Sequence, residues 1–288
     1  MITNKRILKA YEYGERFVVG VSGGKDSTAT CLYLIKNGVD PKDFEKVFMD
    51  TGWEHPKTYE YLNYLESIIG KITYISANIQ VDDEHKDFLE SIEKKLGRKS
   101  QFVRIVLKYT MFPTHLRKSC TRYTKLHVLK DWLNVQEYEY LSLTGVRREE
   151  SQRRSKSLEF EYNTQIKCYT WKPILDWKLQ DVVDIHTEFS IPPNPLYLDK
   201  SDRVGCYPCI HANKSQIEAV DEERKKIIIE IEEYVNDFLS DKEKKTYFTQ
   251  NRPFEEIYDW AKTSYGGKQY KLFDMERPRC ELWGLCGV

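Results

Sequence analysis

The sequence predicts an α/β fold, in which a parallel sheet is flanked by helices. Short apolar segments at residues 16–20, 45–54 and 72–77 alternate with segments whose apolar residues recur at helical spacing. The first segment is rich in valine, which is typical of a strand buried on both faces. This alternation favours parallel strands joined by right-handed crossovers, with ligands bound beyond the carboxyl ends of the strands.

The remaining elements follow from the same patterns. We expect a short helix within residues 1–15, a largely helical block over 89–133 that is broken at Pro113, and a further strand over 138–146. Later segments predict a turn at residues 171–177. They also predict three helices, at 179–189, from 215 onward and at 254–261. The chain is therefore divided into an α/β nucleotide-binding domain, residues 1–214, and a helical region with a cysteine-bearing tail, residues 215–288.

Composition places the chain among soluble globular proteins. Of its 288 residues, 31% are charged and 40% are hydrophobic, which allows a sizeable core. No apolar run approaches the roughly 20 residues of a membrane span, and the N-terminus leads into no signal-like segment. We therefore expect a cytoplasmic protein without a membrane partner.

A glycine turn follows the first strand, with the sequence Ser22-Gly23-Gly24-Lys25-Asp26-Ser27. Unpaired N–H groups and the helix dipole at such a turn favour a phosphate. The Walker loop is excluded, because three residues instead of four separate Gly20 from Gly24 and Asp26 follows Lys25. The dinucleotide fingerprint is excluded because its third glycine is absent.

Charge is unevenly distributed although the formal net charge is zero. Residues 94–130 contain eleven Lys and Arg and no Asp or Glu, whereas residues 218–259 contain thirteen acids and seven bases. The basic segment also carries apolar and aromatic residues, so it is expected to be folded. It suits a polyanion, either a nucleic acid or the phosphates of a nucleotide.

Seven cysteines in such a chain indicate metal or redox chemistry rather than structural disulfides. Two of them form the pair Cys206-Tyr207-Pro208-Cys209. This spacing lets both thiolates reach one metal ion or form a redox disulfide. Spacing alone leaves zinc, an iron–sulfur cluster, free thiols and a thioredoxin-like pair open.

Several different motifs occur one after another between residues 16 and 210. They are the loop at 22–27, the segments 50–52, 145–151, 173–177 and 191–197, and Arg203-Val204-Gly205-Cys206. In this order they resemble the phosphoadenosine-phosphosulfate (PAPS) reductase-like branch of the PP-loop ATP pyrophosphatase, or adenine nucleotide alpha-hydrolase, family. This branch includes the sulfurtransferase subunits of DNA phosphorothioation systems. The resemblance implies a Rossmann-like parallel sheet of five strands.

The resemblance also implies roles for individual residues. Lys25, Asp26 and Arg147 would be catalytic: Lys25 would neutralise the leaving pyrophosphate, Asp26 would help to hold Mg²⁺, and Arg147 would contact phosphate or sulfate. Asp50 would lie near the nucleotide, and Gly145 would let the backbone approach it. The phosphates would be cradled by Ser22, Gly23, Gly24, Ser27 and Thr28. Arg153 and Arg154 are expected to lie in a solvated helix start with i,i+4 ion pairs.

In iron–sulfur members of this branch, a cysteine in a basic segment and a downstream pair hold a [4Fe–4S] cluster. By resemblance, Cys120, Cys206 and Cys209 would be ligands, with Cys286 as the fourth and Cys280 as the second choice. Zinc held by the same ligands is the alternative. Cys31 and Cys168 are expected to be buried or incidental, and His211 is the histidine closest to the pair in sequence.

The resemblance implies an enzyme of sulfur metabolism that binds ATP with Mg²⁺, attacks it at the α-phosphate and releases pyrophosphate for sulfur incorporation. A nucleic acid bound by residues 94–130, and a sulfur donor such as a cysteine desulfurase or thioredoxin, are the expected partners. One alternative is a reductase of PAPS or adenylyl sulfate (APS) that forms sulfite with thioredoxin or glutathione. Another is a non-catalytic nucleotide- or nucleic-acid-binding component with a structural cluster.

Overall fold

The structure is a computed structural model, and it describes residues 4–199, 201, 203–239, 245–249, 252–264 and 283. Within these residues one six-stranded sheet forms the centre of the molecule, with the strand order β3-β2-β1-β4-β6-β5. The strands are β1 (Arg16–Gly20), β2 (Phe44–Asp50), β3 (Thr73–Ser76), β4 (Tyr140–Leu143), β5 (Phe160–Asn163) and β6 (Cys168–Trp171). Neighbouring strands are parallel, except that β5 and β6 are antiparallel.

The predicted α/β fold with a mostly parallel sheet is confirmed, but the prediction of five strands is wrong. The difference lies at one edge, where β5 and β6 form a hairpin. Residues 164–167 turn this hairpin, and the left-handed position is taken by Lys167, at φ 53°, instead of a glycine. The usual hairpin signal is therefore missing from the sequence. The predicted turn at 171–177 also begins one residue late, since Trp171 ends β6.

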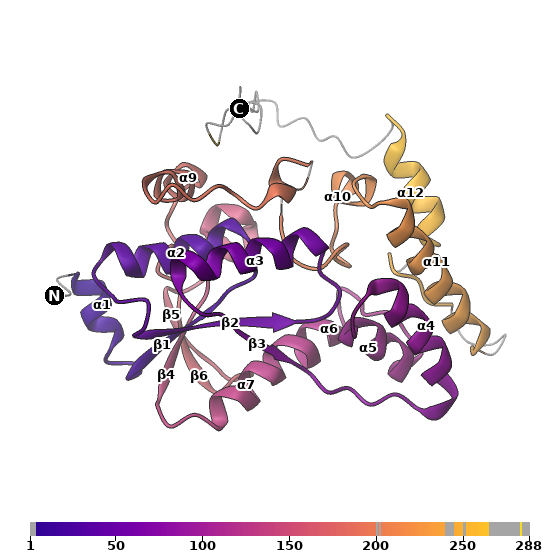
Figure 1. The fold of residues 1–288 in the computed structure, drawn as a ribbon, viewed down its shortest axis with the longest axis horizontal. Helices are drawn as coiled ribbons and strands as arrows, with labels where there is room; N and C mark the ends of the chain where they lie inside the picture. Colours follow the sequence, from indigo (N-terminus) through magenta and orange to yellow (C-terminus); the bar gives the residue numbers. More distant parts are fainter. Residues whose placement is uncertain are drawn as a thin grey trace.

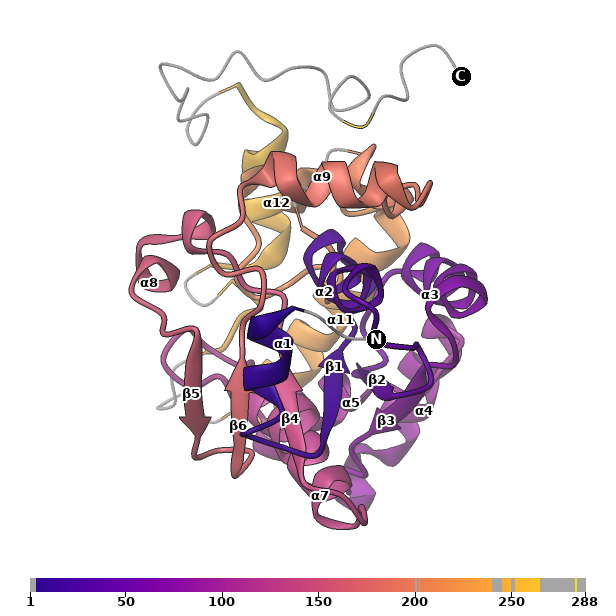
Figure 2. The same cartoon turned by 90° about the vertical axis from the view of Figure 1, so that its left-hand side faces the viewer.

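Helices cover both faces of the sheet (Figures 1 and 2). One face carries α1 (Lys5–Ala10), α2 (Lys25–Lys36), α3 (Pro56–Ile69) and α9 (Leu179–Glu188). Phe17, Leu32 and Trp171, each fully buried, belong to the core between this layer and the sheet. The other face carries α7 (His127–Asn134), whose Leu129 packs with Val18 of β1.

A second group of helices lies beyond the carboxyl ends of the strands (Figure 1). From the predicted helical block come α4 (Lys86–Leu96), α5 (Gln101–Tyr109), α6 (Ser119–Thr121) and the π-helical turn η2 (Arg122–Leu126). The helices α10 (Lys214–Glu218), α11 (Glu222–Asp237) and α12 (Phe254–Lys262) come from the C-terminal region. The remaining short elements are η1 (Asp83–His85), η3 (Arg148–Glu150), α8 (Gln152–Ser155) and η4 (Pro195–Tyr197).

The helix predicted from residue 215 onward is in fact two helices. Asp221 separates them, because its side chain accepts a hydrogen bond from the backbone N–H of Arg224 and so caps the start of α11. The predicted domain boundary at residue 214 stays a prediction. Residues from both sides of it, Trp53 and Phe102 on one and Ile231 and Phe248 on the other, share a single apolar cluster.

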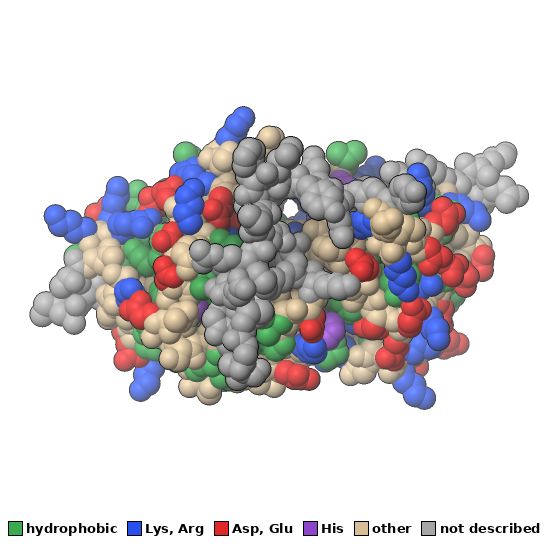
Figure 3. Space-filling model, turned by 90° about the horizontal axis from the view of Figure 1, so that it is seen from above, with side chains coloured by type: hydrophobic (Ala, Val, Ile, Leu, Met, Phe, Trp, Pro, Cys, Tyr) green, Lys and Arg blue, Asp and Glu red, His purple; other side chains and the backbone are tan. Residues whose placement is uncertain are grey.

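Charged side chains of both signs are intermixed on the face above the sheet, which Figure 3 shows. In the part of the chain that the structure describes, no helix is long and apolar enough to cross a membrane.

Candidate functional site

The glycine turn joins β1 to α2 and is braced by its own side chains. Gly23 adopts φ +70°, a conformation that favours glycine. The Ser27 hydroxyl donates to the carbonyl of Gly24 at 2.9 Å and accepts from the backbone N–H of Ser22 at 3.1 Å. Gly24 precedes α2 and offers no side chain to cap it. The first N–H groups of a 12-residue helix therefore meet a glycine turn, the arrangement that suits a phosphate.

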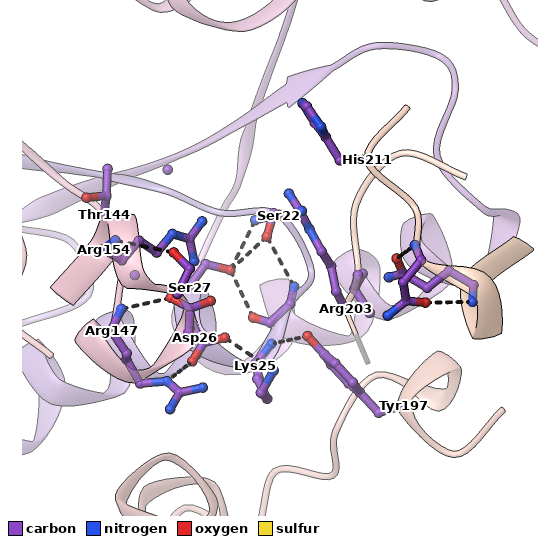
Figure 4. Close-up of a pocket in the computed structure, with 18 of the residues that line it drawn as sticks. Ser22, Lys25, Asp26, Ser27, Thr144, Arg147, Arg154, Tyr197, Arg203 and His211 are labelled. Atoms are coloured by element: carbon purple, nitrogen blue, oxygen red, sulfur yellow. Dashed lines mark hydrogen bonds and ion pairs between the residues drawn. The ribbon is translucent and has the colours of Figure 1, made fainter. Parts of the chain in front are cut away.

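This turn opens into a cavity of about 650 Å³ at the carboxyl end of the sheet (Figure 4). Predicted site residues that line it are Ser22, Gly24, Lys25, Asp26, Ser27, Gly145 and Arg147. Unpredicted members include Met49, Thr144, Glu150, Tyr197 and Arg203. The volume falls within the range of small-molecule sites.

Three charged side chains at one end of the cavity are paired with each other. Arg147, which is 4% exposed, donates from Nε to Asp26 Oδ1 at 2.6 Å and also pairs with Glu149. Lys25 Nζ lies 3.4 Å from Asp26 Oδ2. Burial lowers the pKa of Lys25, but Tyr197 and Asp26 outweigh it, so the pKa is raised above its ordinary value. Lys25 is thus a permanent cation beside the turn.

Three residues that the sequence did not single out hold the turn from outside. Tyr197 accepts a hydrogen bond from the backbone N–H of Lys25 at 3.1 Å, and the Asn194 side chain donates to the carbonyl of Gly23 at 3.1 Å. His186 Nε2 lies 3.0 Å from the carbonyl oxygen of Lys25. Asn194 and Tyr197 belong to the motif at 191–197, so that motif was the available signal.

Gly145 lines the cavity and also lies against the start of α2. A Cβ atom at this position would lie 2.4 Å from the carbonyl oxygen of Asp26 and 2.7 Å from the nitrogen of Ser27. Glycine is therefore required here by the close approach of two backbone segments.

Three predicted nucleotide-binding residues do not line the cavity. The Asp50 carboxylate accepts hydrogen bonds from Tyr59 at 2.7 Å and from the backbone of Gly52 at 2.8 Å. Thr28 is fully buried and its hydroxyl donates to the carbonyl of Gly24. Gly23 contributes its backbone conformation to the turn.

Arg203 and His211 lie at the end of the cavity away from Arg147, whereas Arg154 lies on the Arg147 side, as Figure 4 shows. Arg154 forms the expected i,i+4 ion pair with Glu150. Burial, together with His115, Lys118 and Arg203, lowers the pKa of His211 to about 4. This imidazole is therefore neutral at physiological pH.

A second cavity, of about 200 Å³, adjoins the first and shares Ser22, Arg203 and His211 with it. Three of the predicted metal ligands, Cys120, Cys206 and Cys209, line this second cavity. The structure therefore brings together cysteines from two distant segments. Cys286 and Cys280, the first and second choices for the fourth ligand, lie outside the described residues. Cys31 and Cys168 are buried, as expected.

A lysine that the sequence analysis did not single out also lines the cysteine cavity. Lys125 faces Cys206, Cys209, Cys120 and Glu54, and the nearby Cys206 raises the pKa of Lys125 despite burial. Burial raises the pKa of Cys206 to about 12. Residues 122–126 form a π-helical turn, whose wider winding brings residues five apart, such as Cys120 and Lys125, toward one side.

Glu54 is a buried carboxylate beside the same cysteines. It is 2% exposed and accepts hydrogen bonds from Thr51 at 2.7 Å and Tyr59 at 3.2 Å, while Cys206 Sγ lies 3.9 Å from its Oε1. Among the described residues, no three His, Cys, Asp or Glu side chains are gathered closely enough to form a metal-binding set. The three cysteines nevertheless line one cavity next to the Lys125 cation, and their thiolates are soft donors of the kind that suit zinc or an iron–sulfur cluster.

Comparison with known proteins gives the family. The profile of the phosphoadenosine phosphosulfate reductase domain matches residues 16–212. The chain is 28% identical to an uncharacterized 37.8 kDa protein of Escherichia phage 186, over 88% of this chain and 90% of that protein. It is 34% identical to an adenosine 5'-phosphosulfate reductase of Burkholderia cepacia, but over only 34% of this chain and 38% of that enzyme.

A solved PAPS reductase from Candida auris aligns with a TM-score of 0.41 and 16% identity, covering 67% of this chain and 80% of that one. The profile match spans more than half of the chain and includes the glycine turn, Arg147 and the cysteine pair. The chain therefore belongs to the phosphoadenosine phosphosulfate reductase domain family, and it is a nucleotide-binding enzyme of sulfur metabolism.

Proposed function

We propose that the protein binds ATP with Mg²⁺ in the 650 Å³ cavity and transfers the adenylyl group to an oxygen of a substrate. The substrate oxygen attacks the α-phosphorus, the bond from that phosphorus to the bridging oxygen breaks, and pyrophosphate leaves. The adenylylated position is then activated for the entry of sulfur. One observation carries the proposal: Lys25 and the start of α2, for which Gly24 provides no side-chain cap, lie together at the turn, where a leaving pyrophosphate needs positive charge.

The residues of the turn have separate tasks in this reaction. The N–H groups at the start of α2 and the hydroxyls of Ser22 and Ser27 bind the β- and γ-phosphates. Lys25 neutralises the charge that develops on pyrophosphate. Tyr197, Asn194 and His186 keep the turn in place, so that little reorganisation is needed when the nucleotide binds.

Asp26 is the carboxylate placed to hold Mg²⁺, because hard oxygen donors suit that ion. It lines the cavity, and its two oxygens face Arg147 and Lys25. Mg²⁺ would add positive charge next to the transferred phosphoryl group. Arg147 orients Asp26 and carries a second fixed charge toward the phosphates.

The test is pyrophosphate release from ATP and Mg²⁺ in the presence of candidate acceptors. Lys25→Ala is expected to lower the rate by about 100-fold or more, the scale seen when one charge-stabilising group is removed. Lys36→Ala is the matched control, since Lys36 ends the same helix and pairs with Glu188 on the surface. A preparation that binds ATP tightly but releases pyrophosphate with none of the acceptors contradicts the proposal.

Reduction of adenylyl sulfate, or of its 3'-phosphorylated form, is the second candidate. It is favoured by relatives that are named adenosine 5'-phosphosulfate reductases. In this reaction a cysteine thiolate would attack the sulfur, and thioredoxin or glutathione would release sulfite. Sulfite formation from either nucleotide with thioredoxin supports this candidate, and its absence under conditions of normal nucleotide binding counts against it.

For the cysteine cavity we propose a [4Fe–4S] cluster held by Cys120, Cys206 and Cys209 together with a tail cysteine, with zinc as the alternative. Such a group would tie the tail to the main domain. Anaerobic purification is expected to give iron and an absorbance band at about 400 nm. Cys206→Ser is expected to lose both, whereas Cys168→Ala, outside this cavity, is expected to keep them. A colourless preparation that contains zinc contradicts the cluster.

A further inference from the structure

An exposed patch of cations and tyrosines lies at the end of α5 and the start of η2. We call it the basic–aromatic patch, and it consists of Lys108, Tyr109, Arg117, Lys118, Arg122 and Tyr123. Lys108, Arg117 and Arg122 are exposed, and Tyr109 is 44% exposed. These residues lie near Cys120 in the sequence, and none of them belongs to an apolar cluster of the described residues.

The charge of this patch is not neutralised within the described residues. Of the eleven cations of residues 94–130, Lys95 pairs with Glu230 and Arg104 pairs with Glu93. Lys125 faces the cysteine cavity. No ion pair in the described part of the chain joins a cation of the patch to an acid. The predicted basic segment therefore divides into cations that support the fold and cations that face solvent.

The tyrosines of the patch offer flat surfaces next to these cations. The rings of Tyr109 and Tyr123 are stacked, with centroids 5.8 Å apart, and His127 meets Tyr123 edge-on at 5.2 Å. The Arg122 and Lys108 side chains lie close to the Tyr123 hydroxyl. Cations beside exposed aromatic rings are the features that bind the backbone and bases of unpaired nucleic acid.

The loop that carries Arg117 and Lys118 of the patch also contacts a residue of the nucleotide cavity. The ring of His115, in the loop between Tyr109 and Cys120, lies 4.2 Å from the ring of His211. His211 lines the cavity together with Arg203. Lys118 of the patch and Arg203 of the cavity both lie close to His211.

We propose that the basic–aromatic patch binds a single-stranded or unpaired segment of nucleic acid and places one of its nucleotides at the His211 end of the cavity. The acceptor role of that nucleotide rests on the proposed adenylyl transfer, whereas the binding itself does not. Phosphates lie on the cations, and a base lies against the tyrosine pair. An acidic protein would use the cations but not the exposed ring of Tyr109, so the patch favours nucleic acid.

Binding can be measured by the fluorescence anisotropy of labelled single-stranded DNA and RNA of about 20 nucleotides, titrated at several salt concentrations. Four phosphate contacts predict a slope of log affinity against log salt of about −3. Lys108→Ala with Arg122→Ala is expected to reduce this slope by about 1.4 units and to weaken binding at least tenfold at low salt. ATP binding is expected to stay unchanged in this variant.

Lys42→Ala with Lys71→Ala is the matched control, because both lysines are exposed and adjoin the amino ends of β2 and β3. Tyr109→Ala tests the rings separately and is expected to weaken binding while leaving the salt slope unchanged. Equal binding by the wild type and by the Lys108/Arg122 variant overturns the proposal. Equal competition by a poly-glutamate peptide overturns the assignment to nucleic acid.

The outcome for the proposed function is read separately, from pyrophosphate release with the same oligonucleotides. If the oligonucleotides bind through the patch but do not stimulate pyrophosphate release, the patch is a nucleic-acid binding surface and the bound nucleotide is not the adenylyl acceptor. If the protein releases pyrophosphate with another acceptor but does not bind oligonucleotides, the nucleic-acid surface is rejected and the proposed adenylyl transfer is supported.

Discussion

Tyr197 shows how single residues outside the turn control it. Its phenol oxygen accepts the backbone N–H of Lys25, and its ring lies 4.7 Å from the Lys25 ammonium. Burial raises the pKa of Tyr197, so the hydroxyl stays protonated. One buried side chain therefore fixes both the backbone and the charge of the proposed catalytic lysine.

Replacing Tyr197 by Phe removes the acceptor of that N–H. We expect the free energy of unfolding to fall by about 1 kcal/mol, the net contribution of one hydrogen bond, because the donor is only partly buried. We also expect ATP to bind several-fold more weakly, because the turn is less well held. Urea unfolding and calorimetric titration measure the two effects. Tyr162→Phe, on the exposed edge strand, is the control. If Tyr197→Phe has the same stability and the same ATP affinity as this control, Tyr197 does not hold the turn.

Glu232 of α11 gives a pH-dependent test of the C-terminal core. Its carboxylate accepts hydrogen bonds from the backbone N–H groups of Phe248 at 2.7 Å and Phe254 at 2.9 Å. Burial nevertheless raises the pKa of Glu232 from 4.5 to about 7. A raised pKa in the folded state means that the stabilising contribution of the protonated form is complete below pH 4.5 and is lost as the pH rises through 7.

We therefore expect the wild type to lose about 3 kcal/mol of unfolding free energy relative to Glu232→Gln between pH 4 and pH 8. Comparing the two proteins at each pH cancels the contributions of the other titrating groups to the unfolding free energy. The measurement is urea unfolding across this range. A difference that stays constant with pH contradicts the raised pKa.

At the scale of elements, the site depends on the crossing of the β4–η3 connection and the start of α2. Gly145 lets these two backbones meet, and Arg147 then reaches Asp26 across the same crossing. The cavity is thus bounded by two βα connections of adjacent strands, β1 and β4.

Gly145→Ala is expected to separate these elements. Its Cβ would meet the backbone of Asp26 and Ser27, which cannot rotate away as a side chain could. We expect a loss of about 1 to 3 kcal/mol in unfolding free energy, typical of overpacking, together with weakened ATP binding. Gly205→Ala is the control, since nothing lies within 4 Å of a Cβ there. Equal thermal stability of the two variants argues against the close crossing.

The sequence predicts local elements well where contiguous residues determine a turn or a helix cap. The glycine turn, the helix at 179–189 and the one at 254–261 are of this kind, and α9 and α12 confirm the two helices. The β5–β6 hairpin escapes prediction because Lys167 occupies the position where a glycine would signal it. The break between α10 and α11 escapes because an acidic residue, Asp221, serves as the cap within an acidic run.

For the whole molecule, two apolar clusters decide which parts depend on each other. One lies between the sheet and the layer of α1, α2, α3 and α9. The other joins Trp53 and Phe102 to Phe248 and Phe254 through ring contacts. The C-terminal helices therefore complete the end of the molecule where the cavities lie.

Deletion of residues 215–288 tests this dependence. The truncated chain would expose the apolar surface that Ile227, Ile231 and Phe254 cover, so we expect it to bind a hydrophobic dye and to aggregate. Dye fluorescence and light scattering measure this outcome. A soluble, monomeric 1–214 fragment with the stability of the full chain would instead establish the boundary at residue 214 as that of an independent domain.

Contacts between distant segments limit what the sequence reveals about the site. Cys120 and the pair at 206–209 could be linked only by resemblance, and the fold places them on one cavity. Lys125 and Glu54 could not be predicted, because nothing in their local sequence says that they face those thiols. The place of Asp50 near the nucleotide, which the resemblance implies, stays a prediction; the sequence did not reveal that Tyr59 and the backbone of Gly52 donate hydrogen bonds to its carboxylate.

The central claim is that the turn at Ser22–Ser27 holds the phosphates of a nucleotide. A crystal structure with Mg²⁺ and an ATP analogue that resists cleavage at the α-phosphate tests it most directly. We predict the β- and γ-phosphates at the start of α2, within hydrogen-bond distance of Lys25 and the backbone N–H groups of the turn. A nucleotide bound elsewhere, with this turn unchanged and free of phosphate, would contradict the account.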